Sequence, residues 1–275
     1  TLVYGIIELI NFAHGEIYML GAFTALLVAG VLGIVGFPAG GILIVAALAA
    51  VVWSAAYGYT LEKVAYKPLR GAPRLSPLIS AIGMSIFLQN YVLLAQTSDY
   101  VPFPRLLPEM EFLDYLSNIM GPSDFLILVT STLAMVSLSL FIRYTRMGKA
   151  MRATAQNRKM ALLLGINADR IISLTFIVGS ALAALGGVLI ASHMGQVNFG
   201  IGFLAGLKAF TAAVLGGIGS IPGAMVGGLV LGIAESMTTG YLSGNYEDAL
   251  AFALLILILI FRPDGILGKA KVQKV

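Results

Sequence analysis

The stretch that decides the fold runs from Ile171 to Ser192 and reads Ile-Ile-Ser-Leu-Thr-Phe-Ile-Val-Gly-Ser-Ala-Leu-Ala-Ala-Leu-Gly-Gly-Val-Leu-Ile-Ala-Ser. It contains no charged residue, and its apolar residues form a continuous run. About 20 apolar residues are what an α-helix needs to cross roughly 30 Å of hydrocarbon. A strand of a membrane β-barrel would instead alternate apolar and polar residues. The stretch therefore predicts a membrane-spanning α-helix.

The composition extends this interpretation to the whole chain. Of its 275 residues, 59% are hydrophobic and 11% are charged, and the mean hydropathy is +0.93. Soluble globular domains carry roughly 25% charged residues. We therefore predict an all-α, polytopic integral membrane bundle over residues 1–275, with about eight or nine membrane segments, some of them broken or re-entrant. Because the chain opens inside an apolar run, we expect it to lack the start of its first helix.

Several classes of function are excluded by the residue inventory. The chain has no cysteine, which removes disulfides, thiolate catalysis and cysteine-ligated metals. It has two histidines, too few for most metal centres, and no Gly-x-Ser-x-Gly or His-Glu-x-x-His motif. The net charge of +4 arises from basic residues beside apolar spans, so it does not indicate nucleic-acid binding. We expect neither an enzyme nor a cofactor or metal site.

The distribution of charge predicts the topology. Basic residues gather at Lys63–Arg74, Arg143–Arg170 and Arg262–Lys274. Lys and Arg are enriched in cytoplasmic loops, so we expect these groups to be cytoplasmic. The connection 97–124 is acidic and is therefore predicted to be an outer loop. The intervening apolar runs give spans at 15–35, 38–61, 78–97, 124–144, 171–192 and 248–262.

A short amphipathic helix is predicted over residues 156–164. Met160, Leu163 and Leu164 recur at helical spacing, Gly165 is a suitable C-terminal stop, and Asn167 is a suitable N-cap for the next span. At 1.5 Å per residue the helix covers only ~14 Å, so it must lie across the cytoplasmic surface. Two interpretations remain open, a helix that rests on lipid headgroups and a helix that docks into a cleft on a partner protein.

Four segments carry a resemblance to a known family. The segment Ala155-Gln-Asn-Arg-Lys-Met-Ala-Leu-Leu-Leu-Gly-Ile-Asn167 resembles the cytoplasmic loop of ATP-binding-cassette importer permeases, although it lacks the common Glu-Ala-Ala start. Tyr4–Glu16, Leu78–Tyr91 and Lys208–Ala224 closely resemble the high-affinity branched-chain amino acid permeases. The likeness covers essentially the whole chain, including Pro263–Gly268.

The resemblance implies a set of partners. Two ATPase subunits would bind on the cytoplasmic side, a second related permease would complete the pore, and a soluble periplasmic or extracellular protein would deliver leucine, isoleucine or valine. The setting would be the lipid bilayer of a bacterial plasma (inner) membrane. The chain has no Gly-x-x-x-x-Gly-Lys-Ser/Thr motif, so energy from ATP would have to come from such partners.

The resemblance also makes 145–170 a cytoplasmic coupling loop, in which the helix plugs into the ATPase and Gly165 turns the chain back to the membrane. An ion-coupled secondary transporter or channel for a small solute remains the alternative function. The residues expected to contact the ATPase are Gln156, Asn157, Arg158, Lys159, Met160, Ala161, Leu163, Leu164 and Gly165.

Polar and ionisable residues within apolar runs are candidates for a transport pathway, because charges in a spanning region are costly and usually face a cavity or a partner. The alternating direction of successive spans places Asn11, His14 and Glu16 near the cytoplasmic end of a span. There, an interfacial cap or a contact between His14 and Glu16 is the alternative. Lys208 and Glu235 could instead pair with a neighbouring helix or snorkel to an interface. Gln89 and Asn90 are adjacent, so at most one of them faces the pore while the other bonds a neighbouring helix. The candidates are Asn11, His14, Glu16, Gln89, Asn90, Lys208 and Glu235.

The region 201–239 contains two shorter, glycine-interrupted segments, which either cross the membrane twice or form a re-entrant pair. Both alternatives return the chain to the same side. Glycines spaced by four residues allow close contact between helices, and short, broken segments also indicate a translocation site. The candidate packing residues are Gly223, Gly227, Gly228 and Gly232.

Overall fold

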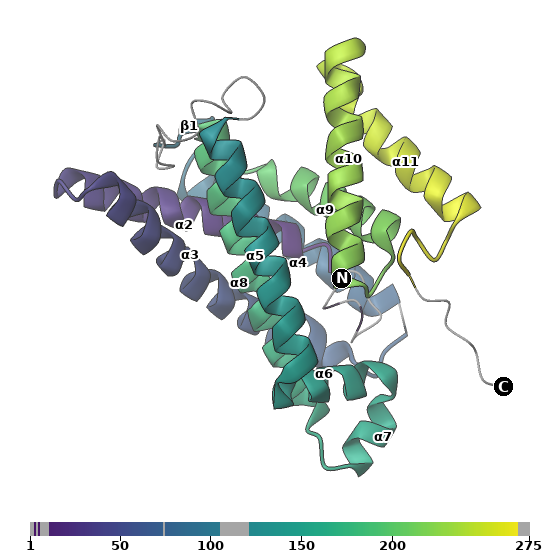
Figure 1. Ribbon diagram of the computed structural model, residues 1–275. Coiled ribbons are helices and arrows are strands. Elements are labelled where there is room, and N and C mark those ends of the chain that lie inside the picture. Colours follow the sequence, from purple (N-terminus) through teal and green to yellow (C-terminus); the bar gives the residue numbers. More distant parts are fainter. Residues whose placement is uncertain (1–2, 4, 6–10, 74, 105–120, 269–275) are drawn as a thin grey trace.

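The computed structural model describes residues 3, 5, 11–73, 75–104 and 121–268, and it is an all-α bundle (Figure 1). The α-helices are α2 (His14–Ile34), α3 (Ala39–Leu61), α4 (Leu75–Ala95), α5 (Pro122–Tyr144), α6 (Arg146–Gln156), α7 (Arg158–Leu163), α8 (Ala168–Met194), α9 (Ile201–Gly216), α10 (Ile221–Tyr241) and α11 (Glu247–Phe261). A π-helical turn, Glu62–Tyr66, and a 3₁₀ turn, Lys67–Leu69, extend α3, and a second 3₁₀ turn, Gly244–Tyr246, precedes α11.

Seven helices in the described part of the chain are long and apolar enough to cross a membrane, by length and composition. They are α2, α3 with its extension, α4, α5, α8, α10, and α11 with the turn before it. The shorter α9 has 16 residues. The predicted all-α polytopic fold is confirmed. The first helix, whose start we expected to be missing, falls largely outside the described residues, because residues 1, 2, 4 and 6–10 are not described.

Helices α2, α3 and α8 form the centre of the bundle, and their packing depends on small residues. A Cβ atom at Gly187 of α8 would overlap the backbone of Tyr18 on α2, and one at Gly58 of α3 would overlap Ser180 on α8. Ile17 and Phe176 fill the space between these helices and are fully buried or nearly so. Such close approach is how membrane helices gain van der Waals contact where lipid supplies no hydrophobic drive for association.

The two long connections lie at opposite ends of α8 (Figure 1). At its C-terminal end, strand β1 (Val101–Pro102) pairs antiparallel with β2 (Gln196–Val197), and His193 Nδ1 lies 3.3 Å from Asp124 Oδ1. At its N-terminal end lie α6 and α7. The described ends of 97–124 and the whole of 145–170 are thus separated by the length of the helix. The sequence did not predict the two strands.

Helices α9 and α10 form a hairpin whose closed end is held by the chain after α11. The Ile266 N–H donates to the Leu215 carbonyl at 2.9 Å, and the Leu267 N–H donates to that of Gly216 at 3.0 Å. Of the two segments that the sequence left open, α10 is long enough to cross the bilayer and α9 is not. The first turn of α9 packs against the start of α2, at Gly15 and Glu16.

Candidate functional site

The connection 145–170 contains two helices where the sequence predicted one. The predicted helix over 156–164 is wrong at its start, because Gln156 ends α6 and the chain is extended at Asn157, with φ −159° and ψ 105°. The Asn157 side chain then accepts a hydrogen bond from the Met160 N–H at 3.0 Å and caps α7. Gln156 therefore belongs to α6, and the short helix begins at Arg158.

The end of α7 follows the predicted chemistry. Gly165 has φ +78°, a conformation that favours glycine. Its N–H donates to the Leu162 carbonyl and the Ile166 N–H donates to that of Ala161, both at 3.0 Å, which is the Schellman arrangement of a helix end. Asn167 then caps α8 by accepting from the Arg170 N–H at 3.1 Å. These local bonds turn the chain from α7 straight into α8.

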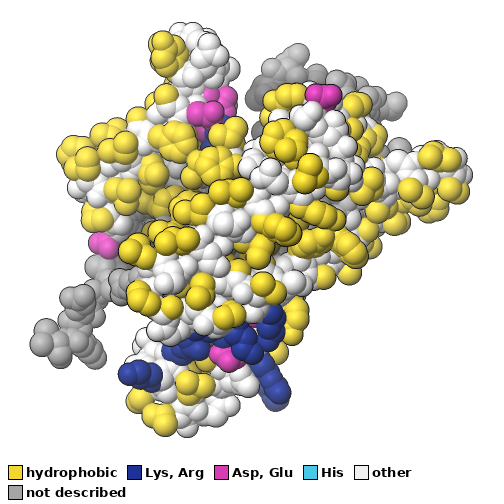
Figure 2. Space-filling view, turned by 180° about the vertical axis from the view of Figure 1, so that it is seen from behind, with side chains coloured by type: hydrophobic (Ala, Val, Ile, Leu, Met, Phe, Trp, Pro, Cys, Tyr) yellow, Lys and Arg dark blue, Asp and Glu magenta, His cyan; other side chains and the backbone are white. Residues whose placement is uncertain are grey.

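The apolar side chains of α7 are exposed. Met160, Leu162, Leu163 and Leu164, here called the leucine patch, have exposed fractions of 57, 53, 82 and 78%, while Ala161 is buried. Figure 2 shows the basic side chains gathered at this end of the molecule, with hydrophobic side chains beyond them. Lys and Arg mark the cytoplasmic edge of the bilayer. An exposed apolar patch marks a surface that contacts another protein or a membrane.

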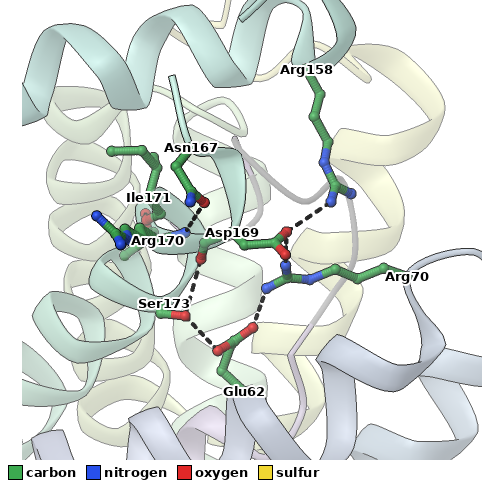
Figure 3. A network of polar contacts seen from close by, with 9 residues as sticks. Glu62, Arg70, Arg158, Asn167, Asp169, Arg170, Ile171 and Ser173 are labelled. Atoms are coloured by element: carbon green, nitrogen blue, oxygen red, sulfur yellow. Dashed lines mark hydrogen bonds and ion pairs between the residues drawn. The ribbon is translucent and has the colours of Figure 1, made fainter. Parts of the chain in front are cut away.

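A series of charged side chains ties α7 to the central helices (Figure 3). Arg158 Nη2 lies 3.1 Å from Asp169 Oδ1 in the first turn of α8, and the same oxygen accepts from Arg70. The Arg70 guanidinium also pairs with Glu62, whose second oxygen accepts from Ser173 Oγ at 2.7 Å. We call Arg158, Asp169, Arg70 and Glu62 the ionic chain. The sequence did not predict it.

The two ends of the ionic chain differ in burial and therefore in strength. Glu62 is fully buried and the Arg70 side chain is 12% exposed, whereas the Arg158 and Asp169 side chains are 42 and 47% exposed. Breaking a buried ion pair leaves an uncompensated charge and costs about 3–5 kcal/mol. An exposed pair contributes about 0–1 kcal/mol. The buried Arg70–Glu62 pair is therefore costly to break, whereas the exposed Arg158–Asp169 pair can break at small cost.

A cavity of about 440 Å³ lies between α2, α5, α8 and α9. This volume is within the range of small-molecule sites, which are mostly apolar with a few polar groups. Its lining residues are Val3, Asn11, His14, Gly15, Tyr18, Leu138, Gly179, Leu182, Ala183, Gly186, Ala205, Gly206, Ala209, Phe210, Ala213 and Ile218. The polar side chains in this wall belong to Asn11, His14 and Tyr18, so the cavity suits a small molecule that is apolar over most of its surface.

Asn11 and His14 lie where α2 begins, which agrees with their predicted place near the end of a span. The His14 ring packs against Gly179 of α8. The Asn11 Oδ1 accepts from the Tyr66 hydroxyl at 2.8 Å, and its buried Nδ2 has no hydrogen-bond partner among the described residues. The Asn11 side chain therefore stands at the cavity wall and is held there by Tyr66.

Glu16 is fully buried beside this cavity and does not line it. Its Oε1 accepts from Ser85 Oγ at 2.9 Å, and Oε2 has no hydrogen-bond partner in the part of the chain that the structure describes. A Cβ atom at Gly202, in the first turn of α9, would lie 2.6 Å from that oxygen. The absence of a side chain at Gly202 brings the carboxylate to a helix N-terminus, whose dipole favours negative charge. Glu16 is thus a core residue rather than an interfacial cap.

The other ionisable candidates lie away from the cavity. Lys208 on α9 forms ion pairs with Glu235 on α10 at 3.2 Å and with Asp248 on α11 at 3.1 Å, and it also contacts Glu247. These contacts support helix pairing, the alternative considered for Lys208 and Glu235.

The polar pair on α4 is also remote from the cavity. Neither Gln89 nor Asn90 lines it. Asn90 is exposed, and its Nδ2 donates to the Ile86 carbonyl of its own helix at 2.8 Å.

The four candidate packing glycines of α10 separate into two faces. Cβ atoms at Gly223 and Gly227 would overlap the backbone of α9, at Gly216 and Ala212 respectively. Cβ atoms at Gly228 and Gly232 would meet nothing within 4 Å. The first pair therefore lets α9 and α10 approach closely, and the second lies on an outward face.

Adjacent glycines on these two faces give a matched test. We expect Gly227→Ala to destabilise the protein by about 1–3 kcal/mol, because the added methyl group forces α9 and α10 apart. Gly228→Ala should leave stability unchanged or raise it by up to about 1 kcal/mol through helix propensity. Thermal unfolding of both variants in detergent measures the difference, and equal midpoints would contradict the assigned faces.

A polytopic helical bundle with a partly open, mostly apolar cavity has an architecture that suits a membrane permease. The family model described as branched-chain amino acid transport system / permease component matches residues 1–259. The chain belongs to this family. It is accordingly a multi-pass membrane permease component, a non-catalytic transport subunit.

Individual relatives support the same assignment. The chain is 52% identical to the high-affinity branched-chain amino acid transport system permease protein LivH of Escherichia coli and 53% identical to the corresponding protein BraD of Pseudomonas aeruginosa. Each alignment covers 100% of this chain and 91% of the relative. A probable LivH permease of Methanocaldococcus jannaschii is 27% identical over 98% of this chain and 86% of the relative. No solved structure matches the chain significantly.

Proposed function

We propose that this chain is one of two related permease subunits of an ATP-driven importer in the bacterial inner membrane, and that it admits leucine, isoleucine or valine. Two ATPase subunits bind on the cytoplasmic side, and a soluble binding protein delivers the amino acid to the outer loop, 97–124. Family membership and the names of the relatives support the substrate class. The observation that carries the partnership with the ATPases is the leucine patch, which is exposed beyond the basic edge of the molecule.

The leucine patch is the docking surface in this proposal. Its side chains enter a cleft on the ATPase, with Gln156, Asn157, Arg158 and Lys159 at the rim. Ala161 faces the permease itself, and the turn at Gly165 returns the chain to α8 within a few residues. Because α7 joins α8 through this short, hydrogen-bonded turn, a displacement of the docked helix moves the end of a central span.

The cavity is the proposed translocation site. Its small and apolar wall, which includes Leu138, Leu182 and Phe210, suits a branched aliphatic side chain. The side chains of Asn11 and His14 supply polar groups for the backbone end of the amino acid. Glu16 acts from behind this wall by holding the first turn of α9 against α2.

The docking proposal predicts that Leu163→Asp weakens binding of the ATPase subunits. Burying a leucine side chain contributes about 2 kcal/mol, so its loss should weaken association roughly 30-fold. Association of purified permease in lipid nanodiscs with the ATPase subunits measures the effect. The matched control is Met147→Asp, which places the same charge at an exposed apolar residue in the first turn of α6, outside the leucine patch.

Two results would contradict the proposed function. Equal ATPase association by Leu163→Asp and Met147→Asp would show that the leucine patch does not dock. Uptake of leucine by proteoliposomes that contain the permease subunits without ATPases would identify a self-sufficient transporter instead.

A further inference from the structure

The ionic chain in Figure 3 ends at Glu62, which lies in the π-helical turn that follows α3. Glu62 opens this turn and Tyr66 closes it. The Tyr66 hydroxyl donates to Asn11 Oδ1 at 2.8 Å, and Asn11 lines the cavity. Polar contacts, together with this one turn of backbone, therefore lead from Arg158 on the docking helix to the cavity wall.

Each contact in this series joins different elements of the fold. Arg158 on α7 binds Asp169 on α8, and Arg70, just after the 3₁₀ turn, binds both Asp169 and Glu62. Asp169 and Ser173 lie on α8, the helix that also supplies Gly179, Leu182, Ala183 and Gly186 to the cavity. The docking helix is thus connected to the cavity wall in two ways, through α8 and through Asn11.

The contacts along this route differ in how easily they break, which suits a conformational switch. The Arg158–Asp169 pair is half-exposed and easily broken, whereas Glu62 is held on both carboxylate oxygens in the buried junction of α3 and α8. The turn from Glu62 to Tyr66 is a π-helix, a form that is rare and frequent at functional sites. Its wider turn can tighten to α-helical geometry, which would rotate Tyr66 relative to Glu62.

We propose that this polar route couples the docking helix to the cavity. When the ATPases move α7, the Arg158–Asp169 pair opens or closes, Arg70 changes its hold on Glu62, and Tyr66 repositions Asn11 toward or away from the substrate. Asp169, Arg70, Glu62 and Tyr66 are positioning residues for transport. This inference rests on the proposed docking of α7.

The test uses two conservative substitutions along the polar route, Asp169→Asn near the docking helix and Tyr66→Phe near the cavity. Both are made in the assembled transporter in proteoliposomes. Tyr66→Phe removes one hydroxyl and keeps the ring, whose centroid lies 5.2 Å from that of Phe176. The control is Tyr59→Phe, the same change at an exposed tyrosine of α3. The readout is the amount of leucine taken up per ATP hydrolysed, with ATPase association and unfolding temperature measured in parallel.

We expect each single substitution to lower uptake per ATP by about fivefold or more, the usual lower range of coupling between sites, with association and folding unchanged. The double variant should be no worse than the poorer single variant, because both act on one route. Tyr59→Phe should match the unsubstituted transporter.

Three outcomes would overturn the route. They are unchanged uptake per ATP in either single variant, multiplicative losses in the double variant, and a loss that falls on ATPase association or folding rather than on the uptake ratio. Failure of the docking proposal is separately visible, because it would appear as normal ATPase association in Leu163→Asp whatever the uptake ratio.

Discussion

Arg70→Met should remove most of the folded permease, because it leaves the Glu62 carboxylate buried without its cation. Glu62 is fully buried, and its Oε1 pairs with Arg70. Losing one partner of a buried ion pair costs about 3–5 kcal/mol, a large part of the roughly 5–15 kcal/mol that stabilises a typical protein. The unfolding midpoint and the yield of monodisperse permease in detergent measure the loss.

A second substitution separates this cause from simple damage to the loop. Adding Glu62→Gln to Arg70→Met removes the unpaired charge and keeps an oxygen that can accept from Ser173, so it should recover most of the lost stability. Arg146→Met is the matched control, because Arg146 is an exposed cation of the neighbouring α6. If Arg70→Met unfolds at the same temperature as Arg146→Met, the pair does not stabilise the fold as we infer.

The spans and the end of the docking helix could be predicted because their causes are local in sequence. The apolar run 171–192 lies within α8, whose bounds are Ala168–Met194. Gly165 and Asn167 stop and start helices through hydrogen bonds to residues three to five positions away. Patterns of this kind depend on neighbours along the chain, and a single sequence displays them.

The ionic chain could not be predicted, because its members meet only in the folded protein. Arg70 and Asp169 are 99 positions apart, and in the sequence both belong to clusters whose composition indicates only topology. The break at Asn157 was missed although asparagine is a good N-cap, because residues 156–159 are all polar and no apolar spacing marks where the helix begins.

The substitution Ala205→Trp should nearly abolish transport while leaving the complex assembled. Ala205 lies on α9 and lines the cavity, so a tryptophan there projects into the space assigned to the amino acid. The added ring takes up space that the substrate would occupy, which should cost about 1–3 kcal/mol, or roughly 5- to 150-fold in uptake. Leucine uptake and ATPase association are measured on the same proteoliposomes.

The expected loss is specific to the cavity, and a lipid-facing position provides the comparison. Ala56 is an exposed alanine of α3 that does not line the cavity, so Ala56→Trp adds the same ring without filling it. ATPase association should be normal in both variants, because the leucine patch is untouched. Uptake and ATPase association are measured separately. A blocked pathway lowers uptake alone, whereas a lost partner lowers both. Uptake by Ala205→Trp at the level of Ala56→Trp would show that the amino acid passes elsewhere in the molecule.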